Sequence, residues 1–314
     1  MVRRGVGSNQ YKTRAAADLV LSAAGPDLMQ QARGDDPLLR RHAAFAVLAH
    51  DEDPDVRLWV ARGKHCPPEL LDQLANDTDA DVRRVVAKDI NTWPATLDRL
   101  ADDPDLGVVQ GVAGNRTCGV DTLRKLANHP DTAVHQLVIR HPNCPPELLG
   151  SANSIFKVDA YTRGLGARNP NTPADILIRL AKDRSASVRE QLAANPRCPP
   201  EACERLVLDP SNRVRWKLAE NPNCPPDVLR RLAQDPDGTV VMYVAGNQNT
   251  PSEVLARLVE ARSATVRAWA ARNPSCPVAL IVKSLQDPDR LVRVGAINNP
   301  NCPEEYRTLH QVAT

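Results

Sequence analysis

The sequence predicts an all-α protein, a solenoid of about ten repeats with two helices each. The main observation is a position occupied by Cys or Thr that recurs every 26 residues, with a single step of 28. A second is the 27 prolines, which prevent long helices and indicate regular interruptions. A third is that apolar columns recur in register with that position, which joins the 314 residues into one array. The recurring position is occupied by Cys66, Thr92, Cys118, Cys144, Thr172, Cys198, Cys224, Thr250, Cys276 and Cys302.

The first helix of each unit follows a column of Val, ten residues before the Cys or Thr. In one unit Val214, Leu218 and Ala219 lie at i, i+4 and i+5, which places them on one helical stripe. A preceding Asp-Pro, as in Asp235-Pro236, predicts an N-cap followed by Pro at the first helical position. The Asn-Pro that follows ends the helix, because the residue before Pro avoids the helical region.

The second helix of each unit begins at Cys/Thr-Pro-Pro-Glu and places Leu at i and i+3. It spans only about two to three turns, which leaves 3₁₀ geometry open for part of it. One unit cannot bury its own apolar stripe, so the units must stack. We expect a basic N-terminal arm, an N-terminal helical cap, the solenoid and a C-terminal cap, at residues 1–14, 15–50, 51–303 and 304–314. The unit that contains residues 151–158 departs from the pattern, which predicts a bend or a ligand-specific irregularity.

The repeated sequence motifs resemble those of the leucine-rich repeat variant family. The shared pattern is Val-Arg-x-x-Val-Ala-x-Asn-Pro-x-Cys-Pro-x-x-x-Leu-x-x-Leu-Ala, repeated over residues 37–305. The resemblance implies alternating α and 3₁₀ helices in a right-handed superhelix, and the units are also similar to short HEAT repeats. A member of that family holds an N-terminal iron–sulfur cluster on clustered cysteines. Here the first cysteine is Cys66, already inside the repeats, so we expect no cluster and no other cofactor.

The cysteines, histidines and paired carboxylates are interpreted as structural. Equivalent atoms of stacked helices lie roughly 8–10 Å apart, whereas disulfide Cα atoms come within about 7 Å. Cys203 falls on the Leu column and is interpreted as a small core residue. His129, His135 and His141 do not share a helical face, so we expect no metal site. The Asp-Pro-Asp phrases provide too few oxygens for calcium and are predicted as helix caps, at Asp53, Asp103, Asp235 and Asp287.

Two basic columns are candidates for function. Directly after the Val column, seven of ten positions are Arg, and this near-constancy favours an internal ladder in which each Arg bonds to a carbonyl or an Asp of a neighbouring unit. A phosphate-binding face is the alternative. The column before the usual Asn varies, which indicates exposure, either as a solvated face or as a broken positive stripe. Its basic members are Arg62, Lys88, Arg140, Arg168 and Arg272.

Large aromatic residues form a third candidate. Trp59, Tyr243 and Trp269 share one column, for which packing between layers is the simplest interpretation. Trp216 lies one residue earlier in its unit, in a column that also contains Arg84 and Glu190. That mixture indicates exposure, so Trp216 is the strongest single candidate for contact with a partner.

These observations favour a non-enzymatic scaffold that binds a protein partner on an extended surface. The main alternative is DNA binding through the basic columns and the N-terminal arm, although the net charge is only +2. A weaker alternative is a DNA-lesion hydrolase with an acidic residue near Trp216 or Trp269, which fold analogy alone supports. Because no secretory signal or membrane-length apolar run is visible, we expect a cytoplasmic protein without a membrane partner.

Overall fold

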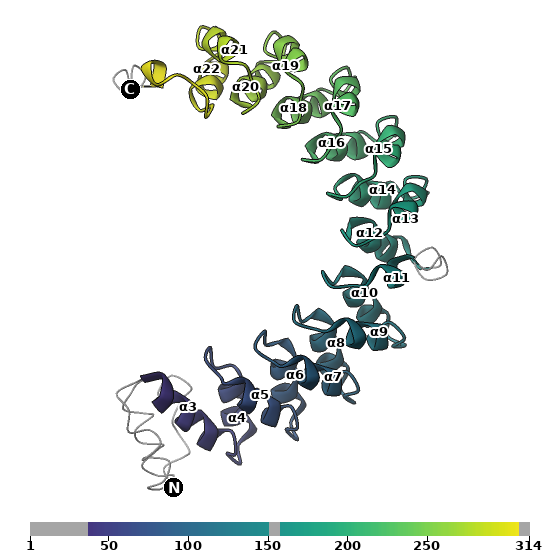
Figure 1. Ribbon diagram of the computed structural model, residues 1–314, viewed down its shortest axis with the longest axis vertical. Coiled ribbons are helices and arrows are strands. Elements are labelled where there is room, and N and C mark those ends of the chain that lie inside the picture. The colour runs from purple at the N-terminus through teal and green to yellow at the C-terminus, as the bar shows by residue number, and fades with distance from the viewer. Residues whose placement is uncertain (1–36, 151–157, 308–314) are drawn as a thin grey trace. The chain divides into compact units, whose positions relative to one another are not determined.

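The computed structural model describes residues 37–150 and 158–307, which form helices and turns without any strand (Figure 1). The predicted basic arm, most of the N-terminal cap, residues 151–157 and the end of the C-terminal cap lie outside this range. None of the helices in the described part has the length and apolar character needed to cross a membrane.

Helices alternate along the chain between two kinds, as the repeat predicts. The first helices are α4 (Pro54–Ala61), α6 (Ala80–Lys88), α8 (Leu106–Gly114), α10 (Thr132–Arg140), α12 (Ala160–Arg168), α14 (Ala186–Ala193), α16 (Asn212–Glu220), α18 (Gly238–Gly246), α20 (Ala264–Arg272) and α22 (Arg290–Ile297). The second helices are α5 (Pro68–Leu74), α7 (Pro94–Leu100), α9 (Val120–Leu126), α11 (Pro146–Gly150), α13 (Ala174–Leu180), α15 (Pro200–Leu206), α17 (Pro226–Leu232), α19 (Ser252–Leu258) and α21 (Val278–Ser284). Helix α3 (Pro37–Leu48) precedes them and falls within the predicted N-terminal cap.

The chain divides into two compact units, one ending at Pro145 and the other beginning at Pro146. Each is a stack of helix pairs, so the predicted all-α repeat architecture is confirmed. In the second unit, Figure 1 shows the first helices α14 to α20 on the inner side of the curve and the second helices on its outer side. The structure therefore identifies which row of the second unit lines its inner face, a point that the sequence leaves open.

The core lies between the two rows and consists of the predicted columns. On α16, Val214, Leu218 and Ala219 are buried, as are Leu229 and Leu232 of α17, which packs against it. Full burial of one such Val or Leu side chain contributes about 1.5–3 kcal/mol. Each unit repeats this pattern, so stability accumulates along the stack through contacts between neighbours.

A ladder of buried asparagines joins successive units, which the sequence analysis did not anticipate. The Asn221 side chain donates to the backbone carbonyls of Ala193 and Asn195 in the preceding unit, both at 2.8 Å. Its own oxygen accepts the backbone N–H of Asn223 at 2.9 Å. The Asn of the Asn-Pro phrase therefore satisfies the carbonyls at the end of the preceding first helix, in addition to ending its own.

The helix caps differ from the prediction at most Asp-Pro phrases. Asp53 is the N-cap of α4, as expected, but the N-cap of α18 is Asp237 rather than Asp235. Asp235 instead accepts the backbone N–H of Asp237 at 2.9 Å and binds Arg215 of the preceding unit. The prediction was wrong because it assigned the carboxylate next to Pro to the nearest helix end. The two Asp residues on either side of the Pro have different roles: the first forms the ion pair and the second caps the helix.

The second helices are α-helices throughout the described residues. In α17, for example, the N–H of Leu229 donates to the carbonyl of Pro225, and that of Ala233 donates to Leu229, both with i→i−4 spacing. Two successive prolines at the start lose no intrahelical bond, because the first N–H groups of a helix have no partner within it. Bonds with the i→i−3 spacing of a 3₁₀-helix occur at the ends of these elements, for example from the N–H of Gln234 to the carbonyl of Arg231 at 3.0 Å.

Candidate partner-binding surface

The inner face of the second unit is formed by the side of each first helix that points away from the core. On α16 the core side holds Val214 and Leu218, so the opposite side presents Trp216 and Glu220. Side chains at the equivalent positions of other units vary in size and charge. Packing does not specify them, so they are free to serve recognition.

A row of aromatic side chains crosses three successive first helices, α16, α18 and α20, on this face. Trp216 on α16 stacks on Tyr243 of α18, with ring centroids 5.0 Å apart and planes inclined by 17°. Trp269 follows on α20 and is 42% exposed, whereas the other two rings are half-buried. The structure therefore brings three of the predicted contact residues together, and they are called the aromatic row below.

Gly246 gives Trp269 its place in the row. A Cβ at Gly246 would lie 2.7 Å from Cε3 of Trp269, closer than any real side-chain contact. The indole thus packs directly on the backbone of α18, one turn after Tyr243. The Trp269 ring of α20 therefore covers the position at which α18 lacks a side chain.

Charged groups beside the aromatic row are largely paired. Lys217 Nζ lies 4.5 Å from the Trp216 ring centroid and 2.7 Å from a carboxylate oxygen of Glu220. Arg213 pairs with Glu190 of the preceding unit at 2.5 Å. Glu220 and Glu190 thus each have a cation partner.

The five predicted basic residues are all exposed at the ends of first helices. Their side chains have no hydrogen-bond or ion-pair partner in the part of the chain that the structure describes. The first unit contains Arg62, Lys88 and Arg140, and the second contains Arg168 and Arg272. Between the last two, the same column holds Ala194, Glu220 and Gly246, so the positive stripe of the second unit is interrupted.

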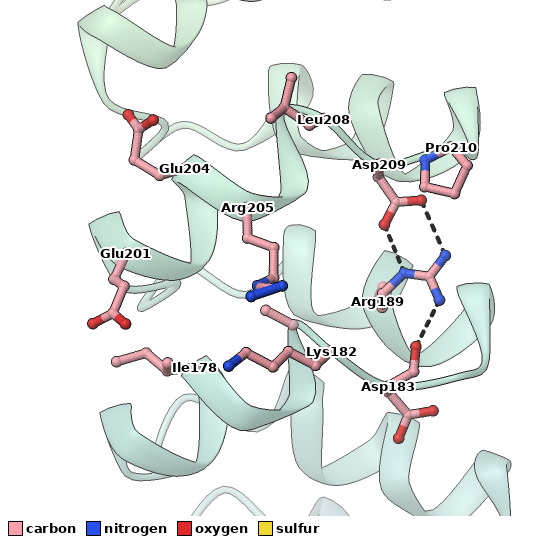
Figure 2. Close-up of a pocket in the computed structure, with 11 residues that line it drawn as sticks. Ile178, Lys182, Asp183, Arg189, Glu201, Glu204, Arg205, Leu208, Asp209 and Pro210 are labelled. Atoms are coloured by element: carbon pink, nitrogen blue, oxygen red, sulfur yellow. Dashed lines mark hydrogen bonds and ion pairs between the residues drawn. The ribbon is translucent and has the colours of Figure 1, made fainter.

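The constant Arg column is an internal ladder, and this interpretation is confirmed. Arg189 Nε lies 2.6 Å from Asp209, twenty residues later, and its Nη1 donates to the carbonyl of Asp183 at 2.6 Å (Figure 2). The same bidentate arrangement recurs at Arg57, Arg83, Arg163, Arg215 and Arg267. Each guanidinium ties its own loop to the next, so these cations are not available to phosphates.

The ladder shifts the pKa values of its members. The hydrogen bonds that Arg83 donates to the Asp103 carboxylate raise the pKa of Arg83. For Asp103, burial tends to raise the pKa, but the bonds from Arg83 and from the backbone N–H of Asp105, with the charge of Arg83, outweigh it and lower the pKa. The ladder is thus charged on both sides over the physiological pH range.

Trp59 serves a different purpose from the aromatic row. It lies on α4 of the first unit and makes an edge-to-face contact with Phe45 of α3, with centroids 5.5 Å apart. Its predicted role in partner binding therefore gains no support from its position. Sequence analysis missed several exposed apolar side chains of the second unit, among them Tyr161 on α12 and Leu291 on α22. Both occupy the column directly before the Val column, whose variability is the signal that could have identified them.

Two larger open hollows lie elsewhere on the described residues, besides a smaller one of about 330 Å³ beside Asp51 and Asp77. One, of about 680 Å³, is lined by α13, α15 and the loops after them, and Figure 2 shows exposed Leu208 and the cations Lys182 and Arg205 around it. The other, of about 540 Å³, lies in the first unit over α8, where Gly107 and Gly111 leave the helix without side chains. Neither combines aromatic and free charged groups as the aromatic row does.

Six of the seven cysteines in the repeat column are buried, as predicted, and Cys198 is half-buried. Burial raises the pKa of Cys66 and of Cys118 to about 12. Within the described residues, no group of three His, Cys, Asp or Glu side chains is placed to hold a metal ion. His141, by contrast, is buried between layers, where it takes the place of an Asn in the asparagine ladder.

Comparison with known proteins agrees with the repeat architecture. Residues 213–237 match the model of the leucine rich repeat variant family, and this span is one of the repeated units. Among solved structures, the chain is similar to "a leucine-rich repeat variant with a novel repetitive protein structural motif", at 21% identity and a TM-score of 0.43, over 80% of this chain and 88% of that one. It is also similar to an engineered protein, at 18% identity and a TM-score of 0.37, over 87% and 97% of the two chains. No curated protein matches the sequence. The repeats are of the leucine-rich repeat variant type.

Proposed function

We propose that this helical repeat protein of the leucine-rich repeat variant type is a non-enzymatic scaffold whose second unit binds a segment of a protein partner. The observation that supports this is the aromatic row, formed by Trp216, Tyr243 and Trp269 on successive helices. Trp and Tyr dominate the energetics of protein interfaces, because they bring large apolar contact areas with few rotatable bonds. A rigid stack of helices presents them already in place.

The surroundings of the row suggest the chemistry of the bound segment. Arg272 lies one turn after Trp269 on α20 and has no partner among the described residues. Lys217 is already neutralised by Glu220. A segment with apolar side chains next to one or two acidic residues would fill the row and pair with Arg272.

Nucleic-acid binding is the second candidate, favoured by the five exposed basic residues without partners. A duplex presents closely spaced phosphates and selects continuous positive surfaces. In the second unit, however, Arg168 and Arg272 are separated by three units that lack a cation in the column. The ladder arginines are also neutralised by aspartates. Protein binding therefore fits the charge distribution better.

The test is a selection of peptides from a random display library on the full-length protein, followed by affinity measurements on the enriched peptides. Trp269→Ala should weaken binding at least about 30-fold, the loss expected for a hot spot of 2 kcal/mol. Trp93→Ala is the matched control, because Trp93 is 41% exposed but lies at the start of α7, a second helix of the first unit. It should leave the affinity unchanged.

Two results would contradict the proposal. One is equal loss of peptide affinity in both tryptophan variants. The other is steeply salt-dependent binding of labelled DNA or RNA, between about 50 and 200 mM salt, that charge reversal at Arg168 and Arg272 abolishes. The second result would establish the nucleic-acid alternative in its place.

A further inference from the structure

Two cysteine thiols of the second unit are in direct contact. Cys198 precedes α15 and Cys203 lies within it, and their Sγ atoms are 3.4 Å apart. Cys203 takes the place that Leu occupies in most units, for example Leu229 and Leu255. The smaller side chain leaves its sulfur facing the thiol of the repeat column. The contact therefore results from a single departure from the repeat.

Cys198 differs from the other cysteines of its column. It is half-buried, whereas the six others are buried. In most of those units the thiol is hydrogen-bonded only to the carbonyl of the next residue, as Cys224 is to Pro225 at 3.9 Å. Cys203, at 1% exposure, is shielded from solvent. The pair thus combines a half-buried cysteine with a buried one.

The geometry is close to that of a disulfide. The two sulfurs need to approach by about 1.4 Å to reach a bond length of about 2.05 Å, which side-chain rotation can supply. The side chains are five residues apart, so no long loop has to close. A disulfide here would add little chain-entropy stabilisation, which suits a bond that forms and breaks rather than a permanent crosslink.

We propose that Cys198 and Cys203 form a dithiol modification site that small-molecule disulfides oxidise to an intramolecular disulfide. The inference does not depend on the proposed partner binding. It assigns a chemical role to the one repeat in which both the Cys column and the Leu column hold a thiol.

The reaction proceeds by two exchanges. The Cys198 sulfur, as thiolate, attacks one sulfur of the small-molecule disulfide, whose S–S bond breaks and releases one thiolate that takes up a proton. The Cys203 thiol then loses its proton to water and attacks the Cys198 sulfur, which expels the second small-molecule thiolate. Two protein thiols are oxidised, and one small disulfide is reduced to two thiols.

The protonation behaviour of the pair favours the thiolate at Cys203, the sulfur that attacks in the second exchange. The hydrogen bond between the sulfurs lowers the pKa of Cys203 and raises that of Cys198, because the two share one proton. Burial alone raises the pKa of Cys276 to about 11. A thiolate is the reactive form, so the hydrogen bond assists the second exchange, in which Cys203 attacks, and not the first, in which Cys198 attacks.

The experiment uses the full-length protein and oxidised glutathione. After incubation at pH 8, free thiols are blocked with N-ethylmaleimide and the protein is digested with trypsin. Cleavage after Arg197 and Arg205 gives the peptide Cys198–Arg205, which contains both cysteines and no other. We expect this peptide to be two hydrogens lighter than the reduced form, unblocked, and without glutathione. The remaining six cysteines should be blocked.

Three variants separate the steps. Cys203→Leu restores the residue of the column, and its Cys198 should retain glutathione as a mixed disulfide. Cys198→Thr places the residue found at Thr172 and Thr250 in the column, and its Cys203 should remain reduced. Cys224→Thr is the matched control, and it should oxidise between Cys198 and Cys203 as the wild type does.

The proposal is overturned if the wild-type Cys198 keeps glutathione instead of releasing it. It is also overturned if the crosslink joins Cys203 to Cys224, or if Cys198 reacts in Cys203→Leu while the wild-type pair stays reduced. The Cys203→Leu variant restores the ordinary core residue, so it should fold at least as well as the wild type.

Discussion

The two columns of the first helices that contain arginine differ in whether the guanidinium groups have partners. Along the loop edge, Arg189 and its equivalents are bound by an aspartate of the next unit and by a loop carbonyl. At the ends of first helices, the side chains of Arg168 and Arg272 have no partner in the described residues, and the three units between them hold Ala, Glu and Gly in that column. A column that stays constant serves the architecture, whereas a column that varies is left to solvent and partners. Recognition should therefore be sought in the variable columns.

The exceptions within the constant column support this distinction. Where the Arg is replaced by Val109, the position twenty residues later is His129 instead of Asp. Where it is replaced by Val241, that position is Ala261. In these two units both members of the pair are missing together, which avoids a buried carboxylate without a cation.

The largest effect is expected from breaking one step of the ladder. Arg189→Met would leave Asp209, which is 7% exposed, with no cation and only the N–H of Ser211 at 2.9 Å. Removing one partner of a nearly buried ion pair costs about 3 kcal/mol. Urea unfolding followed by circular dichroism should show that loss of unfolding free energy.

The variable column provides the matched control. Arg168→Met removes an exposed guanidinium with no partner among the described residues, so the unfolding free energy should change by no more than about 0.5 kcal/mol. Equal destabilisation by the two substitutions would contradict the distinction between the constant and the variable columns.

Much of the architecture could be predicted from the sequence, because it depends on periodic local signals. The Val and Leu columns, the helix ends at Asn-Pro and the internal role of the Arg column all follow from spacing. Contacts between units are harder to predict from the sequence, because they depend on which carbonyl or ring of the neighbouring unit faces a given side chain. The asparagine ladder, the space that Gly246 leaves for Trp269 and the contact of Cys198 with Cys203 each required the structure.

A smaller effect is expected where a histidine interrupts the asparagine ladder. The backbone N–H of Asn143 donates to Nδ1 of His141 at 3.0 Å, so Nε2 carries the proton and donates to the carbonyl of Asn115 at 2.8 Å. Burial lowers the pKa of His141, although the bond to Asn115 opposes the shift. The unfolded chain, with a pKa of about 6.5, then binds more protons below that pH. Stability should decrease as the pH falls through about 6.5, with a slope of at most about 1.4 kcal/mol per pH unit.

The comparison with His141→Asn isolates this effect. Asn is the residue of the column and retains a donor for the carbonyl of Asn115, as Asn221 does for the preceding unit. The difference in unfolding free energy between wild type and variant should therefore grow from pH 7.5 to pH 5.5. A constant difference over that range would show that His141 tolerates its proton in the folded protein.

The smallest effect on stability, and the most informative for the inner face, is expected at Gly246. Replacing Gly by Ala in a helix gains about 1 kcal/mol from propensity, but the new Cβ meets the Trp269 ring at 2.7 Å. The ring is partly exposed and can rotate away, so the two terms should nearly cancel in Gly246→Ala. Gly238→Ala on the same helix, with nothing within 4 Å of its Cβ, is the control. Tryptophan emission should shift to longer wavelength, and peptide affinity should fall, only in Gly246→Ala.

If both variants kept the wild-type emission and affinity, the close packing of Trp269 on α18 would not be what shapes the aromatic row, and binding would have to depend on Trp216 and Tyr243 alone.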